Sequence, residues 1–171
     1  FGSTSLILSN SGTLNLTGLS NSGRGVALRG NNIQSGTANL NIYGSTQGSS
    51  NDAVNITGSI LQSGSGNITF NAVSLCTSTT ISALDNFANV TQTGAGVISI
   101  NALSSSNTAG GNGLYFDGSA KVTQTGMGIV NLNGTASGSQ SAIAFTGGSV
   151  TQTSNGTIGV YSQSPSQSGL I

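Results

Sequence analysis

The chain has very few charged residues and no histidine. Basic and acidic residues number three each, and the charged share of the 171 residues is 4%, against about a quarter in typical domains. Nucleic-acid binding requires clustered basic side chains against the phosphates, so this composition excludes it. Hydrolases and lyases need several carboxylates or a base that activates a nucleophile. The chain offers three aspartates and no histidine. We therefore expect no enzymatic activity and no cofactor.

Cysteine and long apolar runs are equally scarce. Cys76 is the only cysteine, so an internal disulfide is impossible and we expect a structural thiol. No apolar run approaches the roughly 20 residues that span a bilayer, and no basic-then-apolar leader precedes Phe1, which predicts no membrane insertion. Glycine, serine, threonine and asparagine are abundant instead, and such polar, nearly lysine-free sequences are typical of exported surface proteins. We expect an extracellular or cell-surface location.

What the chain does contain is an internal repeat, which decides architecture before any single residue is interpreted. A glutamine at the end of a short strand pattern marks the units, as in Ile60-Leu61-Gln62 and Val90-Thr91-Gln92, and Leu8 occupies the same slot. The predicted repeats have 26–32 residues and fill the chain as one solenoid segment: 9–34, 35–62, 63–92, 93–124, 125–152, and 153–171 plus 1–8.

Each repeat contains three short strand patterns. The first alternates strictly between apolar and polar residues, as in Asn67-Ile68-Thr69-Phe70-Asn71, and period two means one buried and one wet face. We predict an all-β, right-handed parallel β-helix of about six triangular coils, roughly 29 Å tall at ~4.8 Å per coil. Its core should include two inward stacks: Leu16, Ile42, Phe70, Ile100, Leu132 and Val160 from the first strand, and Leu28, Ile56, Phe116 and Phe145 from the second.

The two ends of the chain share one repeat phase. Gly169-Leu170-Ile171 followed by Phe1-Gly2-Ser3 spells GLIFGS, which nearly reproduces GLYFDGS at 113–119. No capping helix, charged edge or proline cluster is evident at either end, although solenoids normally cover their terminal coils. We therefore expect an uncapped block that continues head to tail, with those six residues forming the axial junction.

Three polar columns suggest further roles. Gln34, Gln62, Gln92, Gln124 and Gln152 can stack as a structural amide ladder along the axis, although the sequence leaves open which side of the sheet they occupy. Counting back eight residues from the glutamines places Leu84 opposite Phe116, and hence Asp85 beside Asp117 at roughly 5 Å. Two solvated aspartates, a weak calcium site and a catalytic pair are the alternatives. Outward threonines such as Thr91 and Thr123 resemble an ice-binding array, but Ile7, Ile33 and Leu61 interrupt it.

A mildly apolar strip should lie on the outer surface of the second strand. We expect its positions to be Ala27, Asn55, Ala83, Tyr115, Ala144 and Ile171, while Val97 and Ile129 are exposed on the first strand. Near-zero charge offers no repulsion between neighbours. Lateral bundling of copies is therefore expected through Tyr115 and Ala144 or through Val97 and Ile129.

Strings such as SGTLNLTG, SGSGNITFNA and TSNGTIGV recur once per repeat. They resemble the repeats of filamentous-haemagglutinin-like adhesins and autotransporter-type β-helical surface proteins of bacteria. The resemblance implies secretion and a role in adhesion, aggregation or matrix. We expect a structural segment of an extracellular bacterial fibre, sheath or giant adhesin, whose partner is itself; the alternative is a ligand-binding solenoid for carbohydrate or ice.

Overall fold

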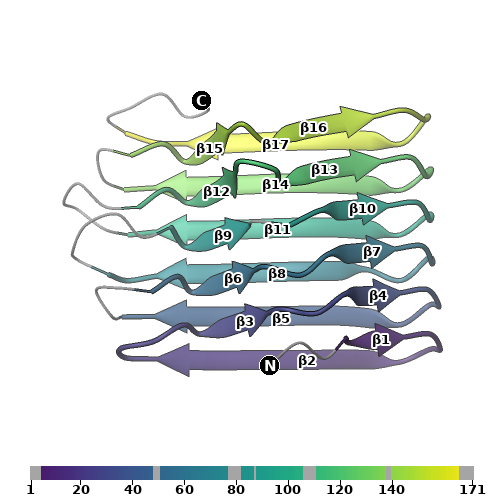
Figure 1. The fold of residues 1–171 in the computed structure, drawn as a ribbon, viewed down its shortest axis with the longest axis horizontal. Helices are drawn as coiled ribbons and strands as arrows, with labels where there is room; N and C mark the ends of the chain where they lie inside the picture. Colours follow the sequence, from purple (N-terminus) through teal and green to yellow (C-terminus); the bar gives the residue numbers. More distant parts are fainter. Residues whose placement is uncertain are drawn as a thin grey trace.

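The computed structural model describes residues 5–47, 51–76, 82–86, 88–105, 111–137 and 140–165. Within these ranges the protein is all-β, and its strands form three parallel sheets stacked as a β-solenoid (Figure 1). The predicted fold class is confirmed. The same ranges hold no helix with the length and apolar character needed to cross a bilayer. The six expected junction residues at the chain ends lie outside the described residues.

Each turn of the solenoid adds one strand to each sheet, which we name A, B and C. Sheet A contains β1 (Ile7–Leu8), β4 (Asn32–Gln34), β7 (Ile60–Gln62), β10 (Val90–Gln92), β13 (Lys121–Gln124) and β16 (Ser149–Gln152). Sheet B contains the long strands β2 (Thr13–Ser20), β5 (Asn39–Thr46), β8 (Ile68–Ser74), β11 (Val97–Ser104), β14 (Ile129–Ala136) and β17 (Thr157–Gln163). Sheet C contains β3 (Val26–Leu28), β6 (Val54–Ile56), β9 (Leu84–Asn86), β12 (Leu114–Asp117) and β15 (Ile143–Thr146).

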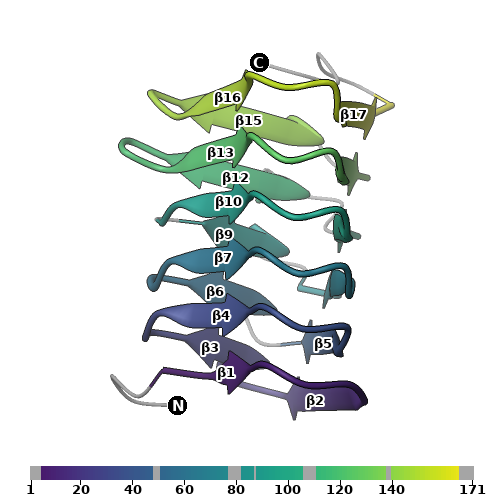
Figure 2. The same ribbon diagram turned by 90° about the vertical axis from the view of Figure 1, so that its right-hand side faces the viewer.

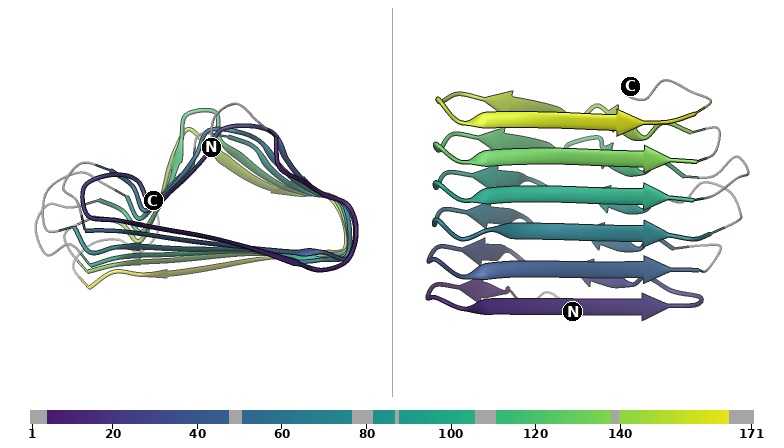
Figure 3. Two further views of the ribbon diagram at one scale, coloured as in Figure 1. Left: turned by 90° about the horizontal axis from the view of Figure 1, so that it is seen from below. Right: turned by 180° about the vertical axis from the view of Figure 1, so that it is seen from behind.

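The chain passes from sheet B to C to A in every turn and climbs from one end of the stack to the other (Figure 2). Five complete turns run from β2 to β16, with β1 before them and β17 after them, which corrects the expected six. Seen along the axis, the sheets outline a three-sided section whose longest side is sheet B (Figure 3). Strand pairing alone does not distinguish the two hands of such a coil, so the right-handed sense stays a prediction.

The pairing register of sheet B follows the repeat. One inward column consists of Leu14, Leu40, Ile68, Ile98, Val130 and Ile158, so the chain advances 26, 28, 30, 32 and 28 residues between neighbours. Along β5 and β11 the side chains alternate between buried and more exposed, as period two predicts.

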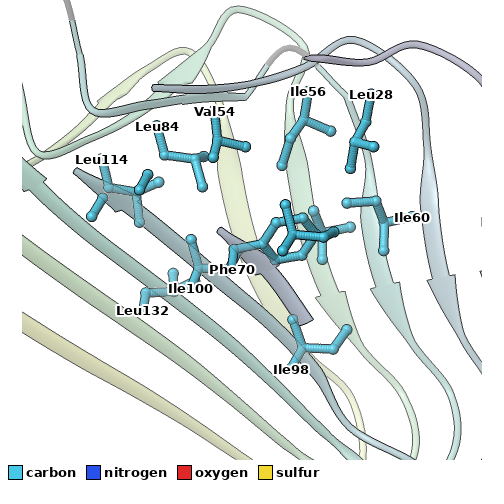
Figure 4. Packing of buried hydrophobic residues seen from close by; sticks show 14 of the residues in the cluster. Leu28, Val54, Ile56, Ile60, Phe70, Leu84, Ile98, Ile100, Leu114 and Leu132 are labelled. Carbon is cyan, nitrogen blue, oxygen red and sulfur yellow. The ribbon is translucent and has the colours of Figure 1, made fainter. Parts of the chain in front are cut away.

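The core is a continuous stack of apolar side chains between the sheets. Ile42, Phe70, Ile100 and Leu132 have no exposed surface, and side chains of sheet C such as Val54 and Leu84 lie on the other side of this core (Figure 4). At the ends of the same column, Leu16 is half-buried and Val160 is 45% exposed. The register thus confirms the first inward stack, whose last member, Val160, remains exposed at the end of the column.

The second expected stack is also largely confirmed. Leu28, Ile56 and Phe116 are buried, and Phe145 is half-buried at the last turn of sheet C. The rings of Phe116 and Phe145 stack in parallel with their centroids 4.7 Å apart. In the third turn, Asn86 of β9 occupies the backbone position that corresponds to Ile56 and Phe116.

The glutamine column lies on the inner side of sheet A, and its first four members have no exposed surface. Gln92 Nε2 donates to Gln62 Oε1 at 3.0 Å, and Gln124 Nε2 donates to Gln92 Oε1 at 3.1 Å. Each amide also donates to carbonyls of the turn that follows it; Gln34 Nε2, for example, lies 2.7 Å from the oxygens of Gly36 and Ala38. The predicted ladder is therefore confirmed from Gln62 through Gln92 to Gln124, and the glutamine column closes the corner between sheets A and B from inside.

Candidate ligand pocket on sheet C

The outer face of sheet C carries the few charged groups that lie near one another. Its central outward column consists of Ala27, Asn55, Asp85, Tyr115 and Ala144 in successive turns. Asp85 therefore lies between an amide below it and a phenol ring above it. Asp52 precedes β6 by two residues, so it stands on the turn beneath Asp85.

These residues border a hollow of about 320 Å³. Four successive connections from sheet B to sheet C contribute to its wall, together with two positions of the outward column. The lining residues are Asp52, Ser82, Asp85, Gly111, Asn112, Tyr115 and Gln140. The wall thus combines two carboxyl groups, two amides, a hydroxyl and one aromatic ring.

Asp52 is held by several partners. Asn55 Nδ2 donates to its Oδ2 at 3.2 Å, and Arg24 Nε lies 3.9 Å from the same oxygen. Burial raises the pKa of Asp52 above its usual value, while the hydrogen bonds and the Arg24 charge oppose that shift. The net direction is upward because burial penalises the charged form more than the partners favour it.

Asp85 has a more strongly perturbed carboxyl group. Burial first, and then the negative charges of Asp52 and Asp117, raise the pKa of Asp85 to about 7, while Arg24 acts in the opposite direction. Its Oδ1 is buried and has no hydrogen-bond partner. Near neutral pH this group can therefore hold a proton and donate a hydrogen bond, or lose it and accept one.

The expected pairing of Asp85 with Asp117 is wrong. Asp85 pairs with Tyr115, and Asp117 pairs with Thr146 of the next turn. The error arose because the count back from glutamine assumed equal connections from sheet C to sheet A. Between Asp117 and Ala120 the chain makes a tight turn, in which the Ala120 amide donates to the Asp117 carbonyl and Gly118 has a φ of +32°. This turn adds two residues after β12, so every position of β12 shifts by two.

The expected calcium pair is therefore not a pair of neighbouring rungs. Across the described ranges no three or more His, Cys, Asp or Glu side chains come close enough together to hold a metal ion. After burial, the negative charge of Asp52 contributes most to the raised pKa of Asp85, although Asp52 was not among the residues expected at this site. It could have been found by aligning the repeats on Val54, Leu84 and Leu114, since Asp52, Ser82 and Asn112 then share one column.

The lateral contact candidates fall in different environments. Ala144 is buried with 3% exposure, and Tyr115 is half-buried with its hydroxyl 2.8 Å from Thr146 Oγ1. Asn55 and Ala83 of the expected strip are also buried, and Asp85 replaces Ala83 in the column. The apolar strip on sheet C is thus wrong, because a carboxyl group interrupts it and its small residues are covered. By contrast, Ile129 is 38% exposed and Val97 half-buried on sheet B.

Comparisons with family models, curated proteins and solved structures gave no match to this chain. Function must therefore be argued from the geometry of the solenoid and its surfaces.

Proposed function

We propose that this chain is an axial structural element of an extracellular bacterial fibre, sheath or giant surface adhesin, with no catalytic role. The observation that carries the proposal is the state of the core at the two ends of the stack. Val160 is 45% exposed and Leu16 half-buried, although their column neighbours Ile42 and Leu132 have no exposed surface. Another coil stacked on each end would bury these side chains as the inner coils bury theirs.

The edge strands support the same proposal. Sheet B ends in β2 on one side and β17 on the other, and an edge strand presents unpaired N–H and C=O groups. Natural proteins usually protect such edges with charges, prolines or covering elements. The sequences of β2 and β17 are TLNLTGLS and TIGVYSQ, which contain no charge and no proline. These edges are suited to pairing with a further parallel strand.

The partner that fits is a coil of the same design. Its strands would continue all three sheets in register, and a block of six rungs would add roughly 29 Å to the fibre. Such a coil can belong to the same polypeptide or to a second copy. Denaturing electrophoresis of the native material separates these cases, because stacked copies would migrate near the 16.7 kDa of this chain and a covalent fibre as a much larger band.

The test uses the 171-residue chain and two lysine variants of β17. Val160→Lys places an ammonium group at the end of the core column, whereas Thr157→Lys changes an outward, exposed residue of the same strand. We expect wild type and Thr157→Lys to grow in length with concentration, as seen by sedimentation and electron microscopy. Val160→Lys should stay much shorter with an unchanged circular dichroism spectrum. A wild-type chain that stays monomeric at every concentration would refute the proposal.

Carbohydrate binding is a second candidate, and the pocket on sheet C is the observation that favours it. Amide, carboxyl and hydroxyl groups around one aromatic ring are the groups that orient a sugar, and the hollow is large enough for a sugar unit. The test is titration of the labelled chain with mono- and disaccharides by NMR. Tyr115→Ala should abolish shift changes near Asp85, while Tyr161→Ala, an exposed tyrosine of sheet B, should leave them unchanged. No shift with any sugar would reject this candidate.

A further inference from the structure

The outer face of sheet B is free of charge. We call it the B face; it consists of the outward side chains of β2, β5, β8, β11, β14 and β17. The six charged residues of the chain all lie on other parts of the molecule: Arg24, Arg29, Asp52, Asp85, Asp117 and Lys121. Nothing on this face therefore repels a second face of the same kind.

Apolar side chains gather along both margins of the B face. Where the strands begin, Ile129 is 38% exposed and Val97 half-buried; we call this pair the entry margin. Where the strands end, Leu75 is 45% and Leu103 39% exposed beside the half-buried Val73; these three form the exit margin. Both margins lie over the middle turns, and Leu19, 72% exposed on β2, continues the column of Val73 and Leu103 to one end of the stack.

Asparagine side chains occupy the space between the margins. Asn101 Nδ2 donates to Asn71 Oδ1 at 2.9 Å, and Asn133 Nδ2 donates to Asn101 Oδ1 at 2.7 Å. Each amide nitrogen has two hydrogens, and the ladder uses one of them. The ladder also fixes the amides in one orientation along the axis, so they present a regular row of polar groups to any partner.

We propose that the B face is covered by the B face of a second copy of this chain, so that fibres associate laterally in pairs. This interface is distinct from the axial contact and goes beyond the proposed function. A twofold axis along the solenoid would place the entry margin of one copy against the exit margin of the other. Strand β11 carries Val97 at its start and Leu103 near its end, so two such strands running in opposite directions bring these side chains together.

The size and spacing of the face favour a second copy over another partner. A strand of eight residues is about 26 Å long and six rungs are about 29 Å tall, which gives roughly 750 Å² per copy, or about 1,500 Å² in total. Stable, specific interfaces bury about 1,200–2,000 Å². Rows of side chains ~4.8 Å apart match a partner with the same row spacing, and another solenoid of this design provides it.

The test compares two lysine variants in the 171-residue chain. Leu103→Lys puts a charge into the exit margin, while Leu61→Lys puts one at an outward, half-buried position of sheet A. Electron microscopy separates the two directions of assembly, since lateral pairing sets filament width and axial stacking sets length. We expect wild type and Leu61→Lys to form paired filaments, and Leu103→Lys to need at least about tenfold more protein for pairing at unchanged length.

A disulfide experiment gives an independent readout. The double variant Val97→Cys, Leu103→Cys should form covalent dimers on mild oxidation, because the twofold arrangement brings the two positions face to face. The matched variant Val97→Cys, Leu61→Cys should not, and the buried Cys76 is present in both. Wild-type filaments of single width, pairing that survives Leu103→Lys, or equal loss with Leu61→Lys would each overturn the lateral proposal, whereas a failure of axial stacking would appear as short particles.

Discussion

Two connections within each coil differ in how much their length varies from turn to turn. From each glutamine of sheet A to the first inward residue of sheet B the chain always takes six residues, as from Gln34 to Leu40 and from Gln124 to Val130. From sheet B to sheet C the spacing differs in nearly every turn. It is 10 residues from Leu16 to Val26, 12 from Ile42 to Val54, 14 from Phe70 to Leu84 and 11 from Leu132 to Ile143.

The difference follows from what each connection touches. The corner after glutamine, which we call the amide corner, stacks backbone on backbone: a Cβ at Gly96 would overlap the carbonyl of Gly66 and the amide of Gln62. An added residue there would break hydrogen bonds of its own turn and of the next. The connection from sheet B to sheet C has exposed positions such as Ser22, where extra residues would disturb only a solvent-exposed hydrogen bond from Asn51 Nδ2 and a local bond to Ser20 Oγ. Buried polar groups thus keep the connection from sheet A to sheet B at a constant length, whereas the connection from sheet B to sheet C varies.

The largest expected effect is a methyl group in the amide corner. Gly96→Ala should lower the free energy of unfolding by about 3 kcal/mol, because overpacking against backbone forces neighbouring turns apart. The matched change is Gly23→Ala in a connection from sheet B to sheet C, where the new Cβ would meet the Ser20 hydroxyl at 3.2 Å. Its cost should stay within about 0.5 kcal/mol. Denaturant unfolding measures both, and equal losses would erase the distinction between the two connections.

Removing one amide from the ladder comes next. Gln92→Leu should cost about 2 kcal/mol, since it strips hydrogen bonds from Gln62 Oε1 and from the carbonyls of Gly94 and Gly96. Gln140→Leu, in the wall of the sheet C pocket, should change stability by less than about 0.5 kcal/mol. A harmless Gln92→Leu variant would mean that glycine and packing alone fix the corner.

The raised pKa of Asp85 on sheet C should make the free energy of unfolding depend on pH. The pKa of Asp85 is raised in the folded protein to about 7 from 3.8, so the folded state binds more protons between these values. Stability should therefore fall as pH rises from about 4 to 7 and level off above that range. Allowing for solvent screening, we expect a loss of ~1–2 kcal/mol. Thermal unfolding of Asp85→Asn should show a much weaker slope, and an identical slope would rule out Asp85 as the source.

The smallest effect should come from lengthening a connection that is already variable. Two glycines inserted after Ser22 should cost less than about 0.6 kcal/mol, because loop closure depends only weakly on length. The same insertion after Thr93 falls inside the amide corner, so it should cause a far larger loss. Denaturant unfolding of the two insertion variants measures both losses. Equal losses would contradict the difference between the amide corner and the connection from sheet B to sheet C.

Prediction from sequence succeeded where the pattern repeats and failed where a connection changes length. The alternation in Leu14-Asn15-Leu16 and its equivalents sufficed for sheet B, and the glutamine marker sufficed for sheet A. In sheet C the strands are short and no marker residue recurs, so the two residues added in the turn after Asp117 went unnoticed. That shift hid the contact of Asp85 with Tyr115 and the role of Asp52.

The parallel solenoid follows from the sequence alone, because period two within strands and a repeated three-strand unit allow few other ways to bury the apolar residues. The sequence also determined that glutamine side chains stack along the axis. The inward direction of these amides came from the folded coil, since the apolar residues directly before Gln34 and Gln62 made both sides of the strand plausible. The tertiary structure likewise decided which acidic groups meet and which face is free of charge, because those depend on connection lengths that no local pattern specifies.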